Sequence, residues 1–450
     1  MRTSSTPRYA SAVSDQHEKR SGSRTSVELF AGGGGLARAV HDAGFRPLLF
    51  NEFAKRACET LVANGAKKVA DGEKPWIPQP GEAVPLVEGD VRDLDMTYLN
   101  GEDVDLLAGG PPCQPFSLGG VAKGDEDERN MFPQMFKAVR QIQPKAVICE
   151  NVRGLLRPSF EPYFDYIQQE LSLPFVKREG ATWQGHNQTL IDLLKDTSSI
   201  PKDERYEVVK VPVNAADYGV PQIRHRVILV AFRADLGVDV NAFEAFVKKQ
   251  RYSETALIRS MLLGEYWERH PKVPDHVRAR VHARLPKTPP ADDGCAPWRT
   301  LRDALKGIRA GEDPLPEVPL DQLDRKTEHG GFAYHYGWPE ARIYDGHTPN
   351  ELDRPAKTVK AGVHGVPGGE SVMLLDQRVA DATAQSGWRY LHRYMTVRET
   401  ARVMTFPDDW NLEGPRGEKM RQLGNAVPVL LGEFFAKAVA DALNEAEGSR

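Results

Sequence analysis

A glycine-rich turn between an apolar strand and a helix constrains the fold of this chain more than any other feature. Residues 26–30 (SVELF) predict a short strand, and the apolar spacing over 36–43 predicts a helix. Gly32, Gly34 and Ala37 match the G-x-G-x-x-A form of a nucleotide-binding turn. A strand, such a turn and a helix in succession predict an α/β fold with a ligand at the end of its first strand.

Two carboxylates that follow later strands add to this prediction. Glu52 comes after the second predicted strand, residues 45–50, where it could accept hydrogen bonds from ribose hydroxyls. Asp90 follows a third short strand and could accept a hydrogen bond from an adenine amino group. The glycine pattern alone fits a nicotinamide-dependent oxidoreductase equally well. It also fits a tight turn without a ligand, and Asp90 could be an ordinary turn residue.

The alternation of strands and helices predicts the fold class and the domain boundaries. Buried strands at 104–108 and 146–149 with a helix between them predict a parallel sheet wound with helices on both faces. This pattern stops near Arg233 and gives way to irregular, proline-rich sequence. We therefore expect a disordered polar tail (1–25), a catalytic and cofactor-binding domain (26–233), a smaller, loop-rich domain (234–390) and a C-terminal segment that completes the catalytic domain (391–450).

The distribution of charge indicates a surface that binds phosphate, although the net charge of −4 does not. Between Lys248 and Arg309 there are 14 Lys and Arg residues against 7 Asp and Glu residues. This basic segment could hold nucleic-acid phosphates, or it could be a solvated charged surface.

Cysteine spacing and apolar runs exclude other classes of protein. The four cysteines include no CxxC pair, so neither a zinc site nor a disulfide framework is expected. No apolar run has the length of a membrane span, and the N-terminus lacks a signal pattern. We expect a protein of the cytosol, associated with the nucleoid if the source is bacterial.

Three strand ends carry side chains that could do chemistry. Cys113 lies in a rigid loop of glycines and prolines (GGPPCQPFS), which could aim a thiolate, although a lone cysteine is usually buried and inert. Glu150 directly follows the strand 146–149, where little water would reach it. Arg224 and Arg226 precede the strand 227–232 on the same side, so their guanidinium groups could converge on a carbonyl or a carboxylate, or face solvent.

Eight segments in this order resemble the motif series of cytosine-C5 DNA methyltransferases. They are FAGGGG, NEF, GDVRDL, GGPPCQPFS, ENVRGLL, QIRHR, RETARVMTFPDDW and QLGNAVP, and they lie within residues 26–233 and 391–440. The resemblance implies a doubly wound, Rossmann-like domain that uses S-adenosyl-L-methionine. It also implies that residues 234–390 are a target-recognition domain, in which RPAKTV (354–359) resembles a recurring family segment.

The resemblance also implies residue roles. Cys113 would attack C6 of the target cytosine, Glu150 would protonate or hydrogen-bond N3, and Arg226 with Arg224 would steady the base carbonyl and the catalytic groups. The residues implied for cofactor binding are Phe30, Gly32, Gly34, Glu52, Phe53, Asp90, Val91, Pro112, Asn425 and Val427. No metal is implied.

The implied partner is double-stranded DNA, from which the enzyme would flip a cytosine within a specific short sequence. A cognate restriction endonuclease would act separately, and the enzyme would work as a monomer away from membranes. A tRNA cytosine methyltransferase with the same motifs and a DNA-binding module with a decayed site remain alternatives. The four consecutive glycines depart from the family pattern, and residues 157–205 have no assigned role.

Overall fold

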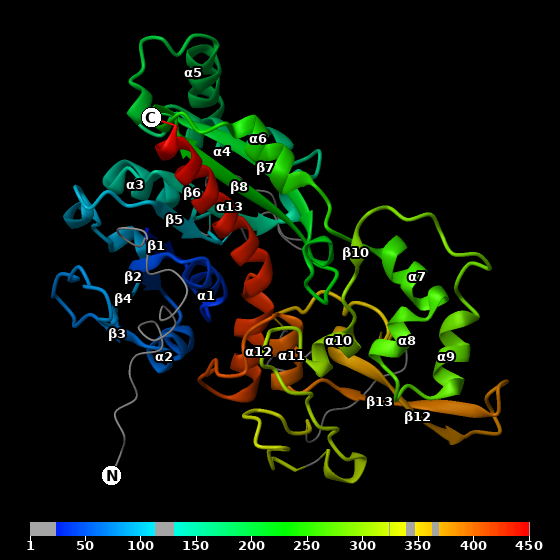
Figure 1. Cartoon of the computed structure of the whole chain (residues 1–450). Coiled ribbons are helices and arrows are strands. Elements are labelled where there is room, and N and C mark those ends of the chain that lie inside the picture. Colours follow the sequence, from blue (N-terminus) through cyan, green and yellow to red (C-terminus); the bar gives the residue numbers. More distant parts are fainter. Residues whose placement is uncertain (1–23, 113–129, 324, 339–346, 362–368, 450) are drawn as a thin grey trace. The chain divides into compact units, whose positions relative to one another are not determined.

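The computed structural model describes residues 24–112, 130–323, 325–338, 347–361 and 369–449 (Figure 1). It divides the chain into two compact units. The first contains residues up to 213 together with 225–249 and 432–450, and the second contains 214–224 and 250–431. In the ranges given above, no helix is long and apolar enough to cross a membrane.

An eight-stranded sheet organises the first unit, in the order β3-β4-β2-β1-β5-β6-β8-β7. The strands are β1 (Thr25–Leu29), β2 (Arg46–Glu52), β3 (Ala66–Lys68), β4 (Val84–Glu88), β5 (Leu106–Gly109), β6 (Ala146–Val152), β7 (Tyr206–Asn214) and β8 (His225–Arg233). The strands from β3 to β6 pair in parallel, so their carboxyl ends meet at one edge of the sheet.

The expected parallel sheet has an exception at strand β8, which pairs with β6 in the antiparallel direction. The reason is the short connection that precedes it. Only residues 215–224 join β7 to β8, and they contain no α-helix. A parallel crossover needs about a dozen residues or more, usually with a helix, so the chain reverses here.

Both faces of the sheet are buried, as a doubly wound fold requires. Val27 and Leu29 on one face of β1 join a large apolar cluster with helices α3 (Phe132–Ile142) and α4 (Glu161–Ser172). Ser26 and Glu28 point to the other face, and each is only 1% exposed. The first unit also contains α1 (Gly35–Asp42), α2 (Lys55–Ala63), α5 (Trp183–Lys195), α6 (Val240–Lys248) and most of α13 (Val429–Gly448).

The second unit is more regular than its sequence suggested. Its helices are α7 (Glu254–Leu263), α8 (Glu265–Arg269), α9 (Asp275–His282), α10 (Leu301–Lys306), α11 (Val397–Val403) and α12 (Arg416–Asn425). Its strands are β9 (Tyr252–Ser253), β10 (Ala296–Pro297), β11 (Asn350–Glu351), β12 (Val372–Ala380) and β13 (Trp388–Tyr394). Strands β12 and β13 form the long antiparallel hairpin seen in Figure 1. Thr300 and Thr396 begin α10 and α11 with capping boxes, which satisfy free N–H groups of the first turns.

Candidate active site

The glycine-rich turn after β1 has the backbone of a ligand-binding loop. Phe30, a predicted cofactor residue, has φ 56°, and Gly32 and Gly34 have φ 55° and 86°. The left-handed region costs little for glycine but is strained for phenylalanine, and such strain is concentrated at functional sites. The four glycines therefore give a tight turn that leads directly into α1.

Glu52 at the end of β2 stabilises this turn through hydrogen bonds. Its Oε2 accepts a hydrogen bond from the Gly32 N–H (2.7 Å), and its Oε1 accepts one from the Ala54 N–H (2.6 Å). An ionised carboxylate has about four acceptor positions, so it can still receive ribose hydroxyls. Phe53 beside it is 75% exposed, which leaves its ring face open to stacking.

Asp90 lies after β4, at the same edge of the sheet. It accepts hydrogen bonds from the backbone N–H and the guanidinium of Arg92, and these bonds lower the pKa of its carboxyl. Asp90 is therefore an ionised acceptor, but Arg92 would compete with an adenine amino group for it. Val91 beside it is 4% exposed and can offer an apolar contact.

These residues fit the adenosine part of S-adenosylmethionine. Backbone N–H groups, a carboxylate for the ribose, an exposed aromatic ring and a second carboxylate all follow the ends of β1, β2 and β4. Asn425 and Val427, also predicted to bind the cofactor, belong to the second unit. Asn425 is exposed and Val427 is 6% exposed.

The segment after β5 is held through the backbone carbonyls of its two prolines. The Asn151 side-chain amide donates to the Pro111 carbonyl (2.9 Å), and the Met131 N–H donates to the Pro112 carbonyl (3.2 Å). Asn151 was not predicted, although its position directly after Glu150 could have suggested a role. Cys113 itself lies outside the described residues, so its predicted role as nucleophile stays a prediction.

Two of the other cysteines are poor nucleophiles. Burial raises the pKa of the Cys58 thiol to about 12, and the charge of Glu52 adds to the shift. Burial likewise raises the pKa of Cys149 to about 12. Because the thiolate is the reactive form, neither is suited to attack a base near neutral pH.

Glu150 and Arg226 come together at the end of the sheet. Glu150 lies opposite Ile228 and Arg226 opposite Val152, which makes Glu150 and Arg226 diagonal neighbours on one face of the β6–β8 pair. Arg226 Nε donates to Glu150 Oε1 at 2.7 Å, and both side chains keep a small exposed fraction, 14% and 12%. Gly110 lies next to them, because a Cβ there would be 3.6 Å from Glu150 Oε2.

Arg224 does not converge with Arg226 on one group, so this expectation is wrong. Its side chain is 1% exposed, and the guanidinium donates to three backbone carbonyls of the second unit, those of Val359, Gly424 and Ala426. The expectation assumed that both arginines lie in one strand, where residues two apart face the same side. Strand β8 begins at His225, so Arg226 lies in it and Arg224 precedes it.

Many cations of the basic segment are bonded within the protein. Arg302 contacts Asp353 and Asp376, and Arg284 contacts Glu351. Backbone carbonyls accept from others, namely Arg259, Arg278, Arg299, Lys306 and Arg309. Lys272 and Lys287 are exposed and have no hydrogen bond or ion pair among the described residues. The excess of basic residues therefore overstates the surface available for phosphate.

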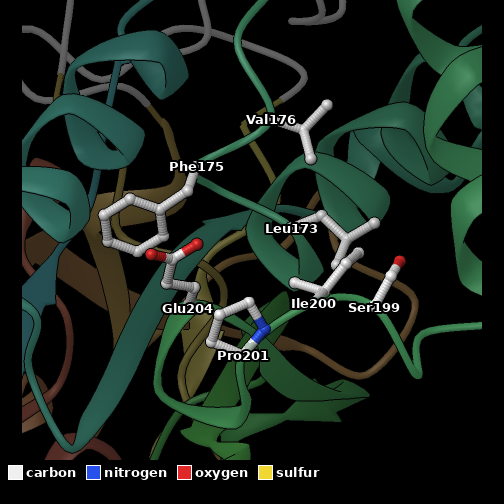
Figure 2. A pocket seen from close by; sticks show the side chains of 7 residues that line it. All are labelled: Leu173, Phe175, Val176, Ser199, Ile200, Pro201 and Glu204. Atoms are coloured by element: carbon white, nitrogen blue, oxygen red, sulfur yellow. The ribbon is translucent and has the colours of Figure 1, made fainter.

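A separate pocket lies in the previously unassigned region that ends before β7 (Figure 2). Its lining is mostly apolar, with one carboxylate, and consists of Leu173, Phe175, Val176, Ser199, Ile200, Pro201 and Glu204. None of these residues is a predicted site residue, so the pocket is distinct from the strand ends described above.

Comparison with known proteins places the chain in a family. The model of the C-5 cytosine-specific DNA methylases matches residues 24–173 and 186–441. The chain belongs to this family. It is therefore a DNA (cytosine-5-)-methyltransferase, and membership implies that it uses S-adenosylmethionine.

Individual relatives agree with this assignment. The chain is 31% identical over 430 residues to the Type II methyltransferase M.PspPI of Psychrobacter sp., and this match covers 93% of the chain and 80% of the relative. It is 31% identical to M.Eco47II of Escherichia coli, covering 94% and 80%. It is 26% identical to the DNA (cytosine-5-)-methyltransferase M.ApeKI of Aeropyrum pernix, covering 93% and 99%.

Proposed function

We propose that this methyltransferase flips a cytosine out of duplex DNA within a specific short sequence and methylates its C5 with Cys113 as covalent nucleophile. The observation that carries the proposal is the Glu150–Arg226 pair next to Gly110. It puts a carboxylate and a guanidinium at the sheet end reached by the segment that leads to Cys113. The bound cofactor, S-adenosylmethionine, would supply an electrophilic methyl group.

The roles of the side chains follow from the chemistry of cytosine. C5 is a poor nucleophile until the Cys113 thiolate forms a bond to C6, which turns the ring into an enamine. Glu150 would hydrogen-bond the ring at N3 and stabilise the proton acquired there. Arg226 would hold the Glu150 carboxylate in place and bind the base carbonyl. After methyl transfer a base removes the C5 proton, and the thiolate leaves C6.

We further propose that Phe30, Gly32, Gly34, Glu52, Phe53, Asp90, Val91, Pro112, Asn425 and Val427 bind the cofactor. Glu52 would receive the ribose hydroxyls while it braces the Gly32 N–H. The names of the two Type II relatives support a role in protecting DNA from a separate restriction endonuclease. The enzyme would work as a monomer in the cytosol.

Transfer of labelled methyl groups tests this proposal directly. The purified protein is incubated with labelled S-adenosylmethionine and either unmethylated duplex DNA or tRNA, and bisulfite sequencing then maps the modified cytosines. We expect label in duplex DNA at one short sequence, and none with Cys113→Ala although that variant still binds DNA. Label in tRNA alone would overturn the substrate, and an active Cys113→Ala would overturn the mechanism.

A further inference from the structure

Three segments of the second unit meet around the side chain of Arg224. We call them together the Arg224 junction: residues 221–224, residues 356–361 and residues 424–426. Arg224 Nη1 donates to the Val359 carbonyl (2.8 Å), and Nη2 donates to the carbonyls of Gly424 (2.8 Å) and Ala426 (3.0 Å). One guanidinium thus ties the second segment to the third.

The first two segments also pair directly. The Ile223 N–H donates to the Ala356 carbonyl (2.8 Å), and the Ala356 N–H donates to the Pro221 carbonyl (2.8 Å). The Val359 N–H donates to the side-chain oxygen of Gln222 (3.0 Å), which is fully buried. Residues 356–361 therefore have a defined register against residues 221–224.

The third segment touches the second without any side chain between them. A Cβ at Gly424 would lie 2.3 Å from the Ala361 nitrogen and 2.3 Å from the Lys360 carbonyl carbon. Real Cβ atoms do not approach that closely, so glycine is required here for steric reasons. A shift of residues 424–426 toward residues 360–361 would therefore displace them.

The two ends of the junction face different ligands under the proposed function. The carbonyls held by Arg224 Nη2 flank Asn425, which together with Val427 is proposed to bind the cofactor. At the other end, Lys360 is exposed and has no hydrogen bond or ion pair among the described residues. An exposed cation of this kind suits a DNA phosphate.

We propose that the Arg224 junction couples the binding of the cofactor at residues 425–427 to the binding of a DNA phosphate at Lys360. This inference rests on the proposed function. The guanidinium is a planar fork with donors in fixed directions, so it can satisfy all three carbonyls only when the two segments are correctly aligned. A ligand that holds one segment in this alignment favours the same alignment of the other. Arg224 is thus a positioning residue and not a catalytic one.

Coupling of this kind is measured as one factor. It is the ratio of the dissociation constants for DNA without and with the second ligand, and linkage requires the same ratio for that ligand without and with DNA. Coupled sites typically give a ratio of roughly 5 to 150. The ratio separates coupling from general damage, because a variant that is merely less stable does not lower it.

The experiment measures DNA affinity by fluorescence anisotropy, with a duplex that contains the sequence found by bisulfite mapping. Saturating S-adenosylhomocysteine is present or absent. We expect a ratio above about 5 for the wild type, and a fall toward 1 in Arg224→Lys and Arg224→Met, because neither side chain can bridge all three carbonyls. Lys360→Ala should lower the ratio while leaving the affinity for S-adenosylhomocysteine alone unchanged.

Arg402→Lys is the matched control. Arg402 is a buried arginine of the same unit that donates to the backbone carbonyls of Leu305 and Asp313 and pairs with Asp408. Among the described residues, it has no hydrogen bond to the junction. It should keep the wild-type ratio. If both Arg224 variants fail to fold, Thr358→Val removes only the hydroxyl bond to the Ile223 carbonyl and should lower the ratio by a smaller factor.

The outcomes separate this inference from the proposed function. A wild-type ratio of 1 in a protein that methylates DNA overturns the coupling and leaves the function intact. The same holds for folded Arg224 variants or a folded Thr358→Val that keep the wild-type ratio. A wild type that neither methylates DNA nor binds S-adenosylhomocysteine overturns the proposed function itself.

Discussion

The two units bury charged side chains in different ways. Glu28 in the sheet of the first unit is 1% exposed, and its carboxyl oxygens have no hydrogen bond to any described residue. Glu399 in the second unit is equally buried but forms two hydrogen bonds with Arg393, at 2.7 and 2.8 Å. The second unit contains more than one ion pair with a buried arginine, such as Arg393–Glu399 and Arg402–Asp408. In the first unit, the Glu150–Arg226 pair lies at an end of the sheet and is partly exposed to water.

The number of basic residues in the second unit is therefore a poor measure of the surface that could bind DNA. Several arginines there are buried inside the unit, where their hydrogen bonds link distant segments of the chain. In the first unit, the partly exposed Glu150–Arg226 pair lies where we propose that the substrate binds. Substitutions in each unit test this difference.

Removal of the charge at Glu150 should affect catalysis and not folding. Glu150→Gln keeps the side-chain size but loses the carboxylate, so we expect methyl transfer to fall by about 10²- to 10⁴-fold, the usual contribution of a positioned acid or base. DNA affinity should stay near that of the wild type. Both quantities are measured with the labelled-methyl assay and a binding titration.

Asp235→Asn is the control for Glu150→Gln. Asp235 also pairs with an arginine, Arg233, at the opposite end of β8 (2.7 Å). It should transfer methyl groups at the wild-type rate. If Glu150→Gln were as active as Asp235→Asn, the sheet end would not be the active site.

In the second unit, loss of an arginine that pairs with a buried carboxylate should affect folding. Arg302 joins Asp353 and Asp376, and Asp353 is 1% exposed. Arg302→Ala leaves these carboxylates without their cation, which should lower the free energy of unfolding by about 3–5 kcal/mol. Arg284→Ala breaks a pair whose arginine is 60% exposed and should cost at most about 1 kcal/mol. Equal costs in urea denaturation would contradict the contrast between them.

The two buried glutamates should give opposite pH dependences. Burial raises the pKa of Glu28 well above its usual value of 4.5, so the folded chain keeps a proton that the unfolded chain releases as pH rises past that value. Stability is therefore lost with rising pH. Glu28→Gln should remove this loss, so its advantage over the wild type grows from pH 4 to pH 8.

Glu399→Gln is the counterpart. Burial alone would raise the pKa of Glu399, but the charge and hydrogen bonds of Arg393 outweigh burial and lower it. Its contribution is present above the ordinary value near 4.5 and is lost as pH falls. The penalty of Glu399→Gln should therefore shrink toward acid pH. Urea denaturation across this pH range measures both variants, and slopes of the same sign would refute the assignment.

Exposed lysines of the basic segment should have the smallest effect. Lys272→Ala and Lys287→Ala each remove one cation that is available to phosphate, so each should weaken DNA binding and lower the slope of log affinity against log salt by about 1. Arg284→Ala, whose guanidinium is already paired, should change the slope less. Binding titrations at several salt concentrations test this, and unchanged slopes for both lysines would place the DNA elsewhere.

The sequence predicted the parts of the site that depend on strands and turns next to each other in the chain. Glu52 ends β2 and Asp90 follows β4 as expected, and Glu150 lies within β6, two residues before its end. A strand followed by a turn is a local pattern, and parallel strands end at one edge. The helix predicted between the strands 104–108 and 146–149 is present as α3 for the same reason. The antiparallel β8 and the helices α7 to α10 were missed, since periodicity gives neither strand direction nor order in proline-rich sequence.

What the sequence determined by itself is the glycine turn, the carboxylates that follow the strands and, through the order of the motifs, the family. Only the tertiary structure decided how the two arginines of QIRHR are used. Arg226 meets Glu150 across one strand pair, whereas Arg224 meets carbonyls 135 and 200 residues further along the chain. A guanidinium binds whichever acceptors surround it, and those acceptors come from segments that only folding brings together.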